Sequence, residues 1–138
     1  MKAAAALSLS LALLWPAMPS VAEPAPRIEL AQLETMFANM RARTPWNVDG
    51  PLLWGYFFFD ADAAKLRSLS AELRSQGYKL VALSPVEGQA LHRLHVEKVE
   101  AHTPQSLHQR NQQLEALAAK FGVASYDGMD VGPVVPAR

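Results

Sequence analysis

The chain contains no cysteine among its 138 residues. Disulfide bonds and cysteine nucleophiles are therefore excluded, and so is a lipoprotein anchor, which is attached to a cysteine. Half of the residues are apolar, which is enough to build a hydrophobic core. The folded state must therefore be held together by packing alone.

The chain also has no surplus of charge of either sign. Its 13 Lys and Arg residues balance its 13 Asp and Glu residues, so the formal net charge is zero. A nucleic-acid binder normally carries a basic surplus that neutralises phosphates. We therefore expect no direct binding to nucleic acid.

Sequence motifs for catalysis are missing as well. The chain has neither a glycine loop of the P-loop or dinucleotide type nor a G-x-S-x-G motif. No serine is set against a recognisable pair of histidine and aspartate. We therefore predict a protein that is not an enzyme and that needs no cofactor.

Residues 1–22 have the pattern of a cleavable export signal. Lys2 supplies the positive charge, residues 3–15 form an apolar stretch, and the small residues at 20–22 resemble a peptidase site. The alternative is a retained membrane anchor, but a spanning helix needs about 20 apolar residues and prolines interrupt this stretch early. We expect cleavage after Ala22 and a periplasmic or secreted mature protein with no membrane segment.

Residues 23–51 are predicted to form a lead-in, a helix and a linker. Four apolar residues recur at the spacing of one buried helix face, namely Leu30, Leu33, Phe37 and Met40. They predict a helix over residues 28–43. Prolines and an Asp-Gly-Pro sequence mark residues 44–51 as the linker.

Residues 52–138 are predicted to form the main domain. Strands are expected at 52–59, 78–83, 91–101 and 123–126, with a bulge near Lys98-Val99 and a turn at Asp127-Gly128. The first helix of this domain should begin at the cap residue Asp60 and end at Gly77. The second should begin at Thr103-Pro104 and end at Gly122.

The resulting order is β-α-β-β-α-β, the split unit of ferredoxin-like folds. The predicted fold class is therefore α+β: a four-stranded antiparallel sheet with two helices on one face, plus an N-terminal helix. In this arrangement the opposite face of the sheet is open to solvent, to another segment or to a partner. One alternative is that the N-terminal helix packs there and fills it.

Aromatic and charged residues are expected on this open face, a mixture typical of binding surfaces. For the first strand two sets are possible: Trp54, Tyr56 and Phe58, or Leu53, Phe57 and Phe59. The third strand should add charged or polar side chains. The candidate protein-binding residues are Trp54, Tyr56, Arg93, His95, Glu97, Tyr126, Asp127 and Asp130. For Tyr126, packing in the interior is favoured over exposure.

A metal site receives little support from the sequence. His95 and Glu97 share one face of a strand and could bind a metal with a third ligand, although surface polar residues are the commoner explanation. His102 and His108, at the start of the last helix, are expected to be solvated. Asp127 and the nearby Asp130 offer too few oxygen ligands for calcium.

Four segments follow one another along the main domain: LLWGYFF at 52–58, the Gly77-Tyr78 junction, LHVEKVEAHTP at 94–104 and AAKFGVASYDG at 118–128. In this order they resemble the regulator of ribonuclease E activity B family. The resemblance implies an α+β protein that binds and inhibits an RNA-degrading endonuclease. The chain departs from relatives that continue with Trp-Gly, because it has Met129-Asp130, and it lacks the acidic tail of some members.

The resemblance and the export signal together predict an exported, non-enzymatic protein-binding module. A cytoplasmic endonuclease cannot be the target of an exported protein, so we expect a periplasmic protein partner. One alternative is an immunity-type inhibitor of a periplasmic toxin or nuclease, and another is a small enzyme or metal binder. A third is a genuine cytoplasmic ribonuclease E inhibitor, if the leader is not used.

Overall fold

The computed structural model describes residues 27–135, so the predicted export signal lies outside the described residues. The elements follow in the order α1 (Leu30–Arg43), β1 (Leu52–Asp60), α2 (Ala63–Ser75), β2 (Lys79–Pro85), β3 (His92–Glu100), α3 (Pro104–Lys120) and β4 (Ser125–Gly132). None of the helices within 27–135 is long and apolar enough to cross a membrane.

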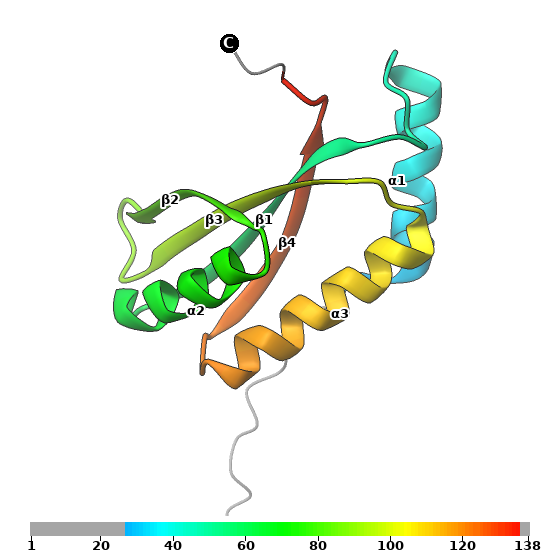
Figure 1. Ribbon diagram of the computed structural model, residues 1–138. Coiled ribbons are helices and arrows are strands. Elements are labelled where there is room, and N and C mark those ends of the chain that lie inside the picture. The colour runs from blue at the N-terminus through cyan, green and yellow to red at the C-terminus, as the bar shows by residue number, and fades with distance from the viewer. Residues whose placement is uncertain (1–26, 136–138) are drawn as a thin grey trace, which may run out of the picture.

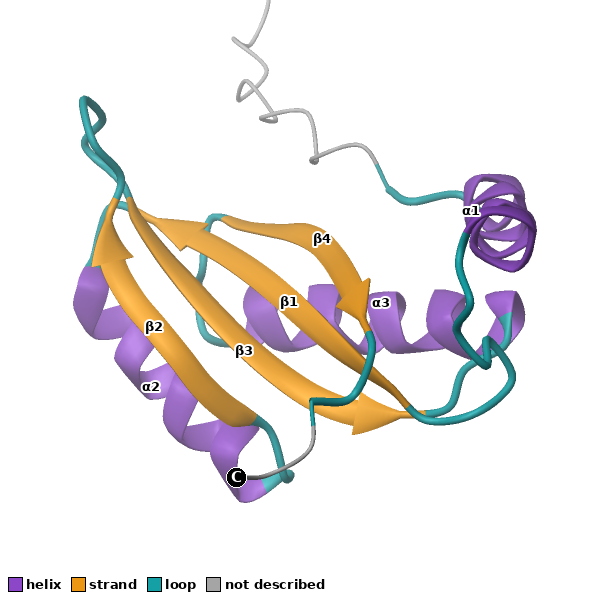
Figure 2. Ribbon diagram, turned by 90° about the horizontal axis from the view of Figure 1, so that it is seen from above, coloured by secondary structure: helices purple, strands orange, loops and turns teal. Residues whose placement is uncertain are grey.

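The four strands form one sheet in the order β2-β3-β1-β4, and every neighbouring pair is antiparallel. Helices α2 and α3 both cover the same face of this sheet (Figure 1). Seen from above in Figure 2, the sheet lies in front of the two helices. The predicted ferredoxin-like α+β sandwich is thus confirmed.

Strand β1 supplies the largest part of the core. Trp54, Tyr56 and Phe58 point toward the helices and have exposed fractions of 1% or less. They pack with three leucines of α2 that are also fully buried: Leu66, Leu69 and Leu73. On the other face of β1, Leu53, Phe57 and Phe59 are only half-buried, as expected for a strand in which one face meets the helices and the other does not.

The ends of α3 follow the predicted capping residues. The hydroxyl of Thr103 accepts a hydrogen bond from the backbone N–H of Ser106 at 3.1 Å, and the Ser106 hydroxyl accepts from the N–H of Thr103 at 2.9 Å. This reciprocal pair satisfies two donors at the start of the helix. At the other end, Gly122 adopts a φ of +66°, which lets the chain leave the helix without steric cost.

Asp60 does not cap α2 as predicted. It is the last residue of β1, and its buried carboxylate accepts hydrogen bonds from the backbone N–H groups of Asp62 at 2.7 Å and Ala124 at 2.8 Å. Asp62 caps the helix instead, by accepting from Ala64 N–H at 2.8 Å. Asp60 therefore ties the end of β1 to the segment that enters β4.

The predicted end of the last strand is wrong. Asp127-Gly128 does not form a turn, because β4 runs on to Gly132. The register between β1 and β4 shifts between Tyr56 and Phe58, and Gly128 has a φ of +97°. The Asp-Gly pair therefore forms a bulge within the strand, where glycine adopts the required positive φ without steric strain.

The bulge predicted at Lys98-Val99 is also absent. Strand β3 pairs with β1 without a shift from His92 to Glu100. The irregularity lies in β2, where the pairing with β3 shifts between Leu80 and Ala82. The apolar and polar residues of β3 stop alternating near Lys98 because Lys98 and Glu100 belong to a polar cluster on the helix-covered side, which is described below.

Helix α1 does not fill the open face. Its buried residues are Leu33, Phe37 and Met40, and the ring of Phe37 stacks on Trp54 with centroids 5.9 Å apart. Because Trp54 points toward the helices, α1 joins the same core as α3. Figure 2 shows α1 end-on beside the sheet, beyond β4, with the face of the sheet left clear.

Candidate functional site

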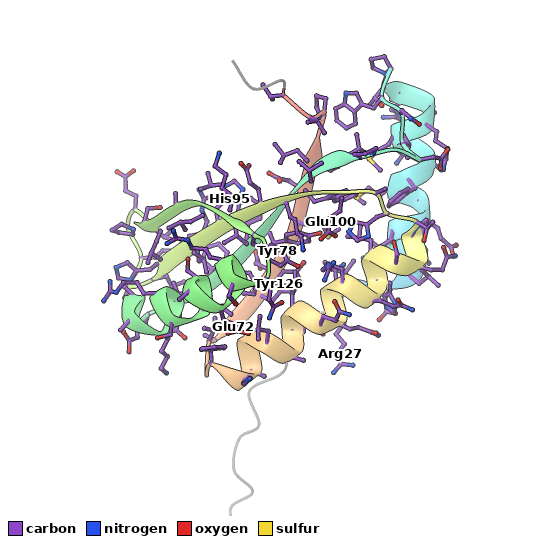
Figure 3. All side chains as sticks on the ribbon, in the orientation of Figure 1. Arg27, Glu72, Tyr78, His95, Glu100 and Tyr126 are labelled. Carbon is purple, nitrogen blue, oxygen red and sulfur yellow. The ribbon has the colours of Figure 1, made fainter. Side chains whose placement is uncertain are left out.

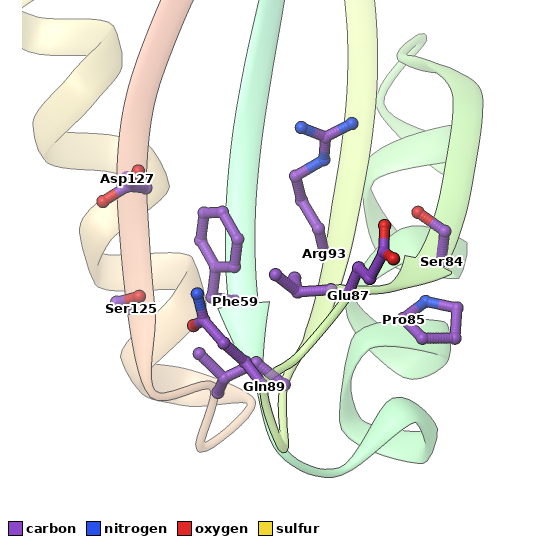
Figure 4. Close-up of a pocket in the computed structure, with 10 residues that line it drawn as sticks. Phe59, Ser84, Pro85, Glu87, Gln89, Arg93, Ser125 and Asp127 are labelled. Atoms are coloured by element: carbon purple, nitrogen blue, oxygen red, sulfur yellow. The ribbon is translucent and has the colours of Figure 1, made fainter.

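The face of the sheet opposite α2 and α3 is called the open face from here on. Its residues on β1 and β3 are cross-strand partners: Leu53 with Val99, Gly55 with Glu97, Phe57 with His95 and Phe59 with Arg93. The register adds Lys79, Ala82 and Ser84 from β2, and Ser125 and Asp130 from β4. Asp127, at the bulge, lies beside Phe59 on this face (Figure 4).

The centre of the open face is a layered aromatic and cationic stack. The imidazole of His95 lies on the ring of Phe57, with centroids 4.4 Å apart and planes inclined by 22°. The guanidinium carbon of Arg93 lies 5.5 Å from the centroid of the same Phe57 ring. Stacking and cation–π attraction therefore hold two polar side chains against one apolar platform.

Gly55 leaves space for side chains of β3 and β4 to approach each other over β1. A Cβ built on Gly55 would collide with Oδ1 of Asp130 and would lie 2.8 Å from Nε2 of His95. The side chains of Asp130, from β4, and His95, from β3, thus lean over β1 from opposite sides. Only a residue without a side chain permits this approach across the intervening strand.

A hollow of about 600 Å³ lies at one end of the open face, beside the β2–β3 hairpin. Figure 4 shows Phe59 beside Asp127 on β4, with Arg93 between Phe59 and Glu87 of the hairpin. Further residues on the hairpin side of the hollow are Ser84, Pro85, Val86, Gln89 and Leu91. The hollow is therefore lined by an aromatic ring, by Arg93 and by one carboxylate at each side.

The predicted site residues divide between the two faces. Arg93, His95, Glu97, Asp127 and Asp130 lie on the open face. The candidates Trp54, Tyr56 and Tyr126 do not, because they are buried on the helix-covered side. Figure 3 shows this contrast for His95 above the sheet and for Tyr126 between the sheet and the helices.

Tyr126 packs in the interior, as predicted. Its ring lies 5.1 Å from that of Phe58, and its hydroxyl donates a hydrogen bond to Oδ1 of Asn111 at 2.5 Å. The residues that sequence reasoning left out of the candidates are Gly55, Phe57 and Phe59. Phe57 and Phe59 belonged to the alternative set for β1, whereas no local signal marked Gly55.

Side chains that could hold a metal do not converge in the described part of the chain. Across residues 27–135, no three His, Asp or Glu side chains are grouped closely enough to bind an ion. His95 and Glu97 share the open face, as predicted, but no third ligand joins them in such a group.

A second polar cluster lies on the helix-covered side, around the carboxylate of Glu100. Arg110 donates to it at 2.9 Å through Nη2 and at 3.3 Å through Nε. Nζ of Lys98 lies 3.3 Å from Oε1, and Nε2 of His102 lies 2.5 Å from Oε2. His102 is therefore buried and bonded, not solvated as predicted.

Burial alone would raise the pKa of Glu100. Hydrogen bonds and positive charge from His102, Arg110 and Lys98 outweigh that effect and lower the pKa to about 2. The carboxylate is thus already satisfied by its own neighbours. We conclude that the cluster anchors the end of β3 to α3, and that it is a structural feature rather than a second candidate site.

The fold and the open face define a class: a small α+β domain of ferredoxin-like topology whose sheet presents one uncovered aromatic and charged surface. The family model described as regulator of ribonuclease activity B matches residues 31–131, from α1 into the end of β4. The chain therefore belongs to the regulator of ribonuclease activity B family. None of the curated proteins matches the chain.

Proposed function

We propose that this protein is an exported, non-enzymatic regulator that binds a protein partner outside the cytoplasm through its open face. The observation that carries the proposal is the uncovered stack of Phe57, His95 and Arg93, beside the recess at Gly55. Membership in a family of regulators supports protein binding as the mode of action.

The composition of the open face fits a protein interface. Such interfaces combine aromatic residues and arginine at the centre with a polar rim. Phe57 supplies the aromatic centre, while Glu97 and Lys79 face each other across the β2–β3 ladder toward the edge of the sheet. His95 and Arg93 are already held in place by Phe57, so little conformational freedom would be lost when a partner binds.

Affinity capture with matched variants tests the binding surface. The tagged full chain is used to capture partners from a periplasmic extract, next to Phe57→Ala, Arg93→Ala and the control Arg67→Ala. Arg67 is an exposed arginine of α2, on the other side of the molecule. We expect a stoichiometric protein partner with the wild type and with Arg67→Ala, and its loss with the two open-face variants. Equal capture by all the variants would overturn the assignment of the open face.

Fractionation of cells that produce the tagged chain tests export. We expect the mature protein in the periplasmic fraction, with its first residue at Glu23 as a result of cleavage after Ala22. An uncleaved protein in the cytoplasm would instead contradict export. In that case a cytoplasmic ribonuclease becomes the target, and inhibition of the purified endonuclease is the measurement to make.

A further inference from the structure

The open face carries more negative than positive charge, although the whole chain is neutral. Its carboxylates are Glu97, Asp127 and Asp130, and Glu87 adds a fourth at the edge of the hollow. Against them stand two cations, Lys79 and Arg93. A surface with this imbalance attracts a partner of positive charge and repels phosphates.

These carboxylates have no ion-pair partner within residues 27–135. The ion pairs of the described residues involve Glu100, Glu115 and Asp49 as the acidic members, and none of these lies on the open face. Glu100 shows the contrast, because three basic side chains surround its carboxylate. The open-face carboxylates are therefore available to charged groups from outside.

The hollow beside the hairpin has the shape and chemistry for one cationic side chain. Phe59 and the carboxylates of Asp127 and Glu87 line it together with Arg93, which stands between Phe59 and Glu87 (Figure 4). The nearest cation, Arg93, is held over Phe57 and forms an ion pair with neither of these carboxylates. A guanidinium or ammonium group over an aromatic ring gains cation–π attraction in addition to the charge pairing.

Helices α2 and α3, taken by themselves, have the opposite balance. Helices α2 and α3 carry five cations, Lys65, Arg67, Arg74, Arg110 and Lys120, against the carboxylates of Glu72 and Glu115. The two helices thus carry a net positive charge, whereas the open face carries a net negative one. Such a separation of charge orients a basic partner toward the open face before contact is made.

We infer that the partner segment that occupies the open face is basic, and that it places an arginine or lysine side chain in the hollow between Glu87 and Asp127. The inference rests on the proposed function, because it names the chemistry of the partner at that same face. Arginine fits better than lysine, because its planar group can stack on Phe59 while it bonds to a carboxylate.

Short synthetic peptides test the inference directly on the full-length protein. Three peptides of equal length share a Gly-Ser background and carry arginine, lysine or glutamate at the same positions. Binding is measured by calorimetry at about 0.15 M salt, where the Debye length of about 8 Å suppresses distant attraction. We expect the arginine peptide to bind most tightly, the lysine peptide more weakly and the glutamate peptide not at all.

Two matched double variants locate the binding. Glu87→Gln with Asp127→Asn removes both carboxylates of the hollow, and Glu72→Gln with Glu115→Gln removes two carboxylates from the helix-covered side. Both variants change the net charge equally. We expect the first to weaken the arginine peptide about tenfold or more, as loss of charge-pair partners does at interfaces, and the second to leave it unchanged. Thermal midpoints that match the wild type confirm that the variants are folded.

Several outcomes would overturn the inference. Equal weakening by the two double variants would indicate diffuse attraction and no site in the hollow. Binding of the glutamate peptide would show that charge does not select the ligand. Failure of every peptide to bind would contradict the inference that the partner segment is basic. If Phe57→Ala abolishes capture of the natural partner but the hollow variant retains it, the inference fails and the proposed function stands. If neither variant affects capture, the proposed function fails as well.

Discussion

The imidazole of His95 lies stacked on Phe57, its direct partner across the β1–β3 ladder, with ring centroids 4.4 Å apart. The next residue of β1, Phe58, has the opposite orientation and is completely buried beneath the helices. Two adjacent phenylalanines therefore serve different purposes, one at the surface of the sheet and one in the core.

Alanine substitution at the two positions separates these purposes. Phe58→Ala should lower the free energy of unfolding by about 3–5 kcal/mol, because it leaves a cavity in the packed core. Phe57→Ala should cost about 1–2 kcal/mol, because this ring is only half-buried. Urea unfolding measures both values. In NMR spectra of Phe57→Ala, the ring protons of His95 should also lose the shift caused by the stacked phenyl ring. An equal loss of stability in both variants would contradict the assigned orientation of β1.

A methyl group at Gly55 should disturb the open face but spare the fold. In Gly55→Ala the new Cβ would meet Asp130 Oδ1 and His95 Nε2, both of which are ends of flexible side chains. These side chains can move aside, so the urea midpoint should change little, while the NMR signals of the His95 ring should shift and capture of the partner should weaken. Gly132→Ala is the control, because nothing lies within 4 Å of a Cβ at that position. Identical behaviour of the two variants would argue against a functional recess at Gly55.

The fold could be predicted because its signals are local. The leucine stripe of α2, the cap at Thr103 and the glycine after α3 each indicate one element, and their order gives the topology. The position of α1 could not be read in the same way. Its apolar face shows that it packs, but only the contact of Phe37 with Trp54 shows where.

The candidate site was predictable on β3 and not on β1. In β3 the buried Leu94 and Val96 alternate with polar residues, so Arg93, His95 and Glu97 must face the other way. Strand β1 is apolar on both faces, and its pattern therefore carries no information on which set is buried. The structure places Phe57 and Phe59 on the open face and buries the predicted Trp54 and Tyr56 beneath the helices.

The end of β4 shows a different limit of sequence reasoning. An Asp-Gly pair is favourable in a tight turn and also in a bulge, because both use the positive φ that glycine tolerates. Local preference cannot separate the two, since the pairing with β1 decides between them. In this chain β1 is long enough to pair with residues on both sides of Gly128.

Acid should destabilise the protein through Glu100. Its pKa is lowered to about 2 in the folded state, below the ordinary value of 4.5, so the unfolded state binds a proton first as the pH falls. The stabilisation is complete above about pH 5 and is lost between about pH 4.5 and pH 2, and it amounts to about 3 kcal/mol. Urea unfolding across this pH range measures the slope of the free energy of unfolding against pH.

Substitution of Glu100 provides the control for this slope. Glu100→Gln should be less stable at neutral pH, because Arg110 and Lys98 lose their charged partner, and its stability should depend less on pH below 5. Glu97→Gln removes a carboxylate from the same strand but from the open face, and it should retain the slope of the wild type. An unchanged slope in Glu100→Gln would assign the acid sensitivity to another group.

Tyrosine hydroxyls beneath α3 should differ in what they contribute to stability. The hydroxyl of Tyr126 donates to Asn111, whereas that of Tyr78 is buried with no partner in the described residues. Tyr126→Phe should therefore lower the free energy of unfolding by about 1–3 kcal/mol, because it leaves a buried amide oxygen unsatisfied. Tyr78→Phe should be neutral or slightly stabilising. Equal losses in urea unfolding would indicate that Tyr78 also has a partner in solution.

In an alkaline titration, all three tyrosines of the chain should ionise together, when the protein unfolds. Burial raises the pKa of Tyr56 and Tyr126 far above 10, and it raises the pKa of Tyr78 to about 12. In the folded protein at about pH 11, phenolate absorbance at 295 nm should therefore be nearly absent, although free tyrosine is mostly ionised there. The unfolded state loses these protons above about pH 10, so stability is full below that pH and falls as the pH rises. Absorbance should thus appear together with the loss of far-ultraviolet circular dichroism. If one tyrosine ionises near pH 10 while the helices remain intact, that ring is exposed, and the packing of the sheet beneath α3 would need to be revised.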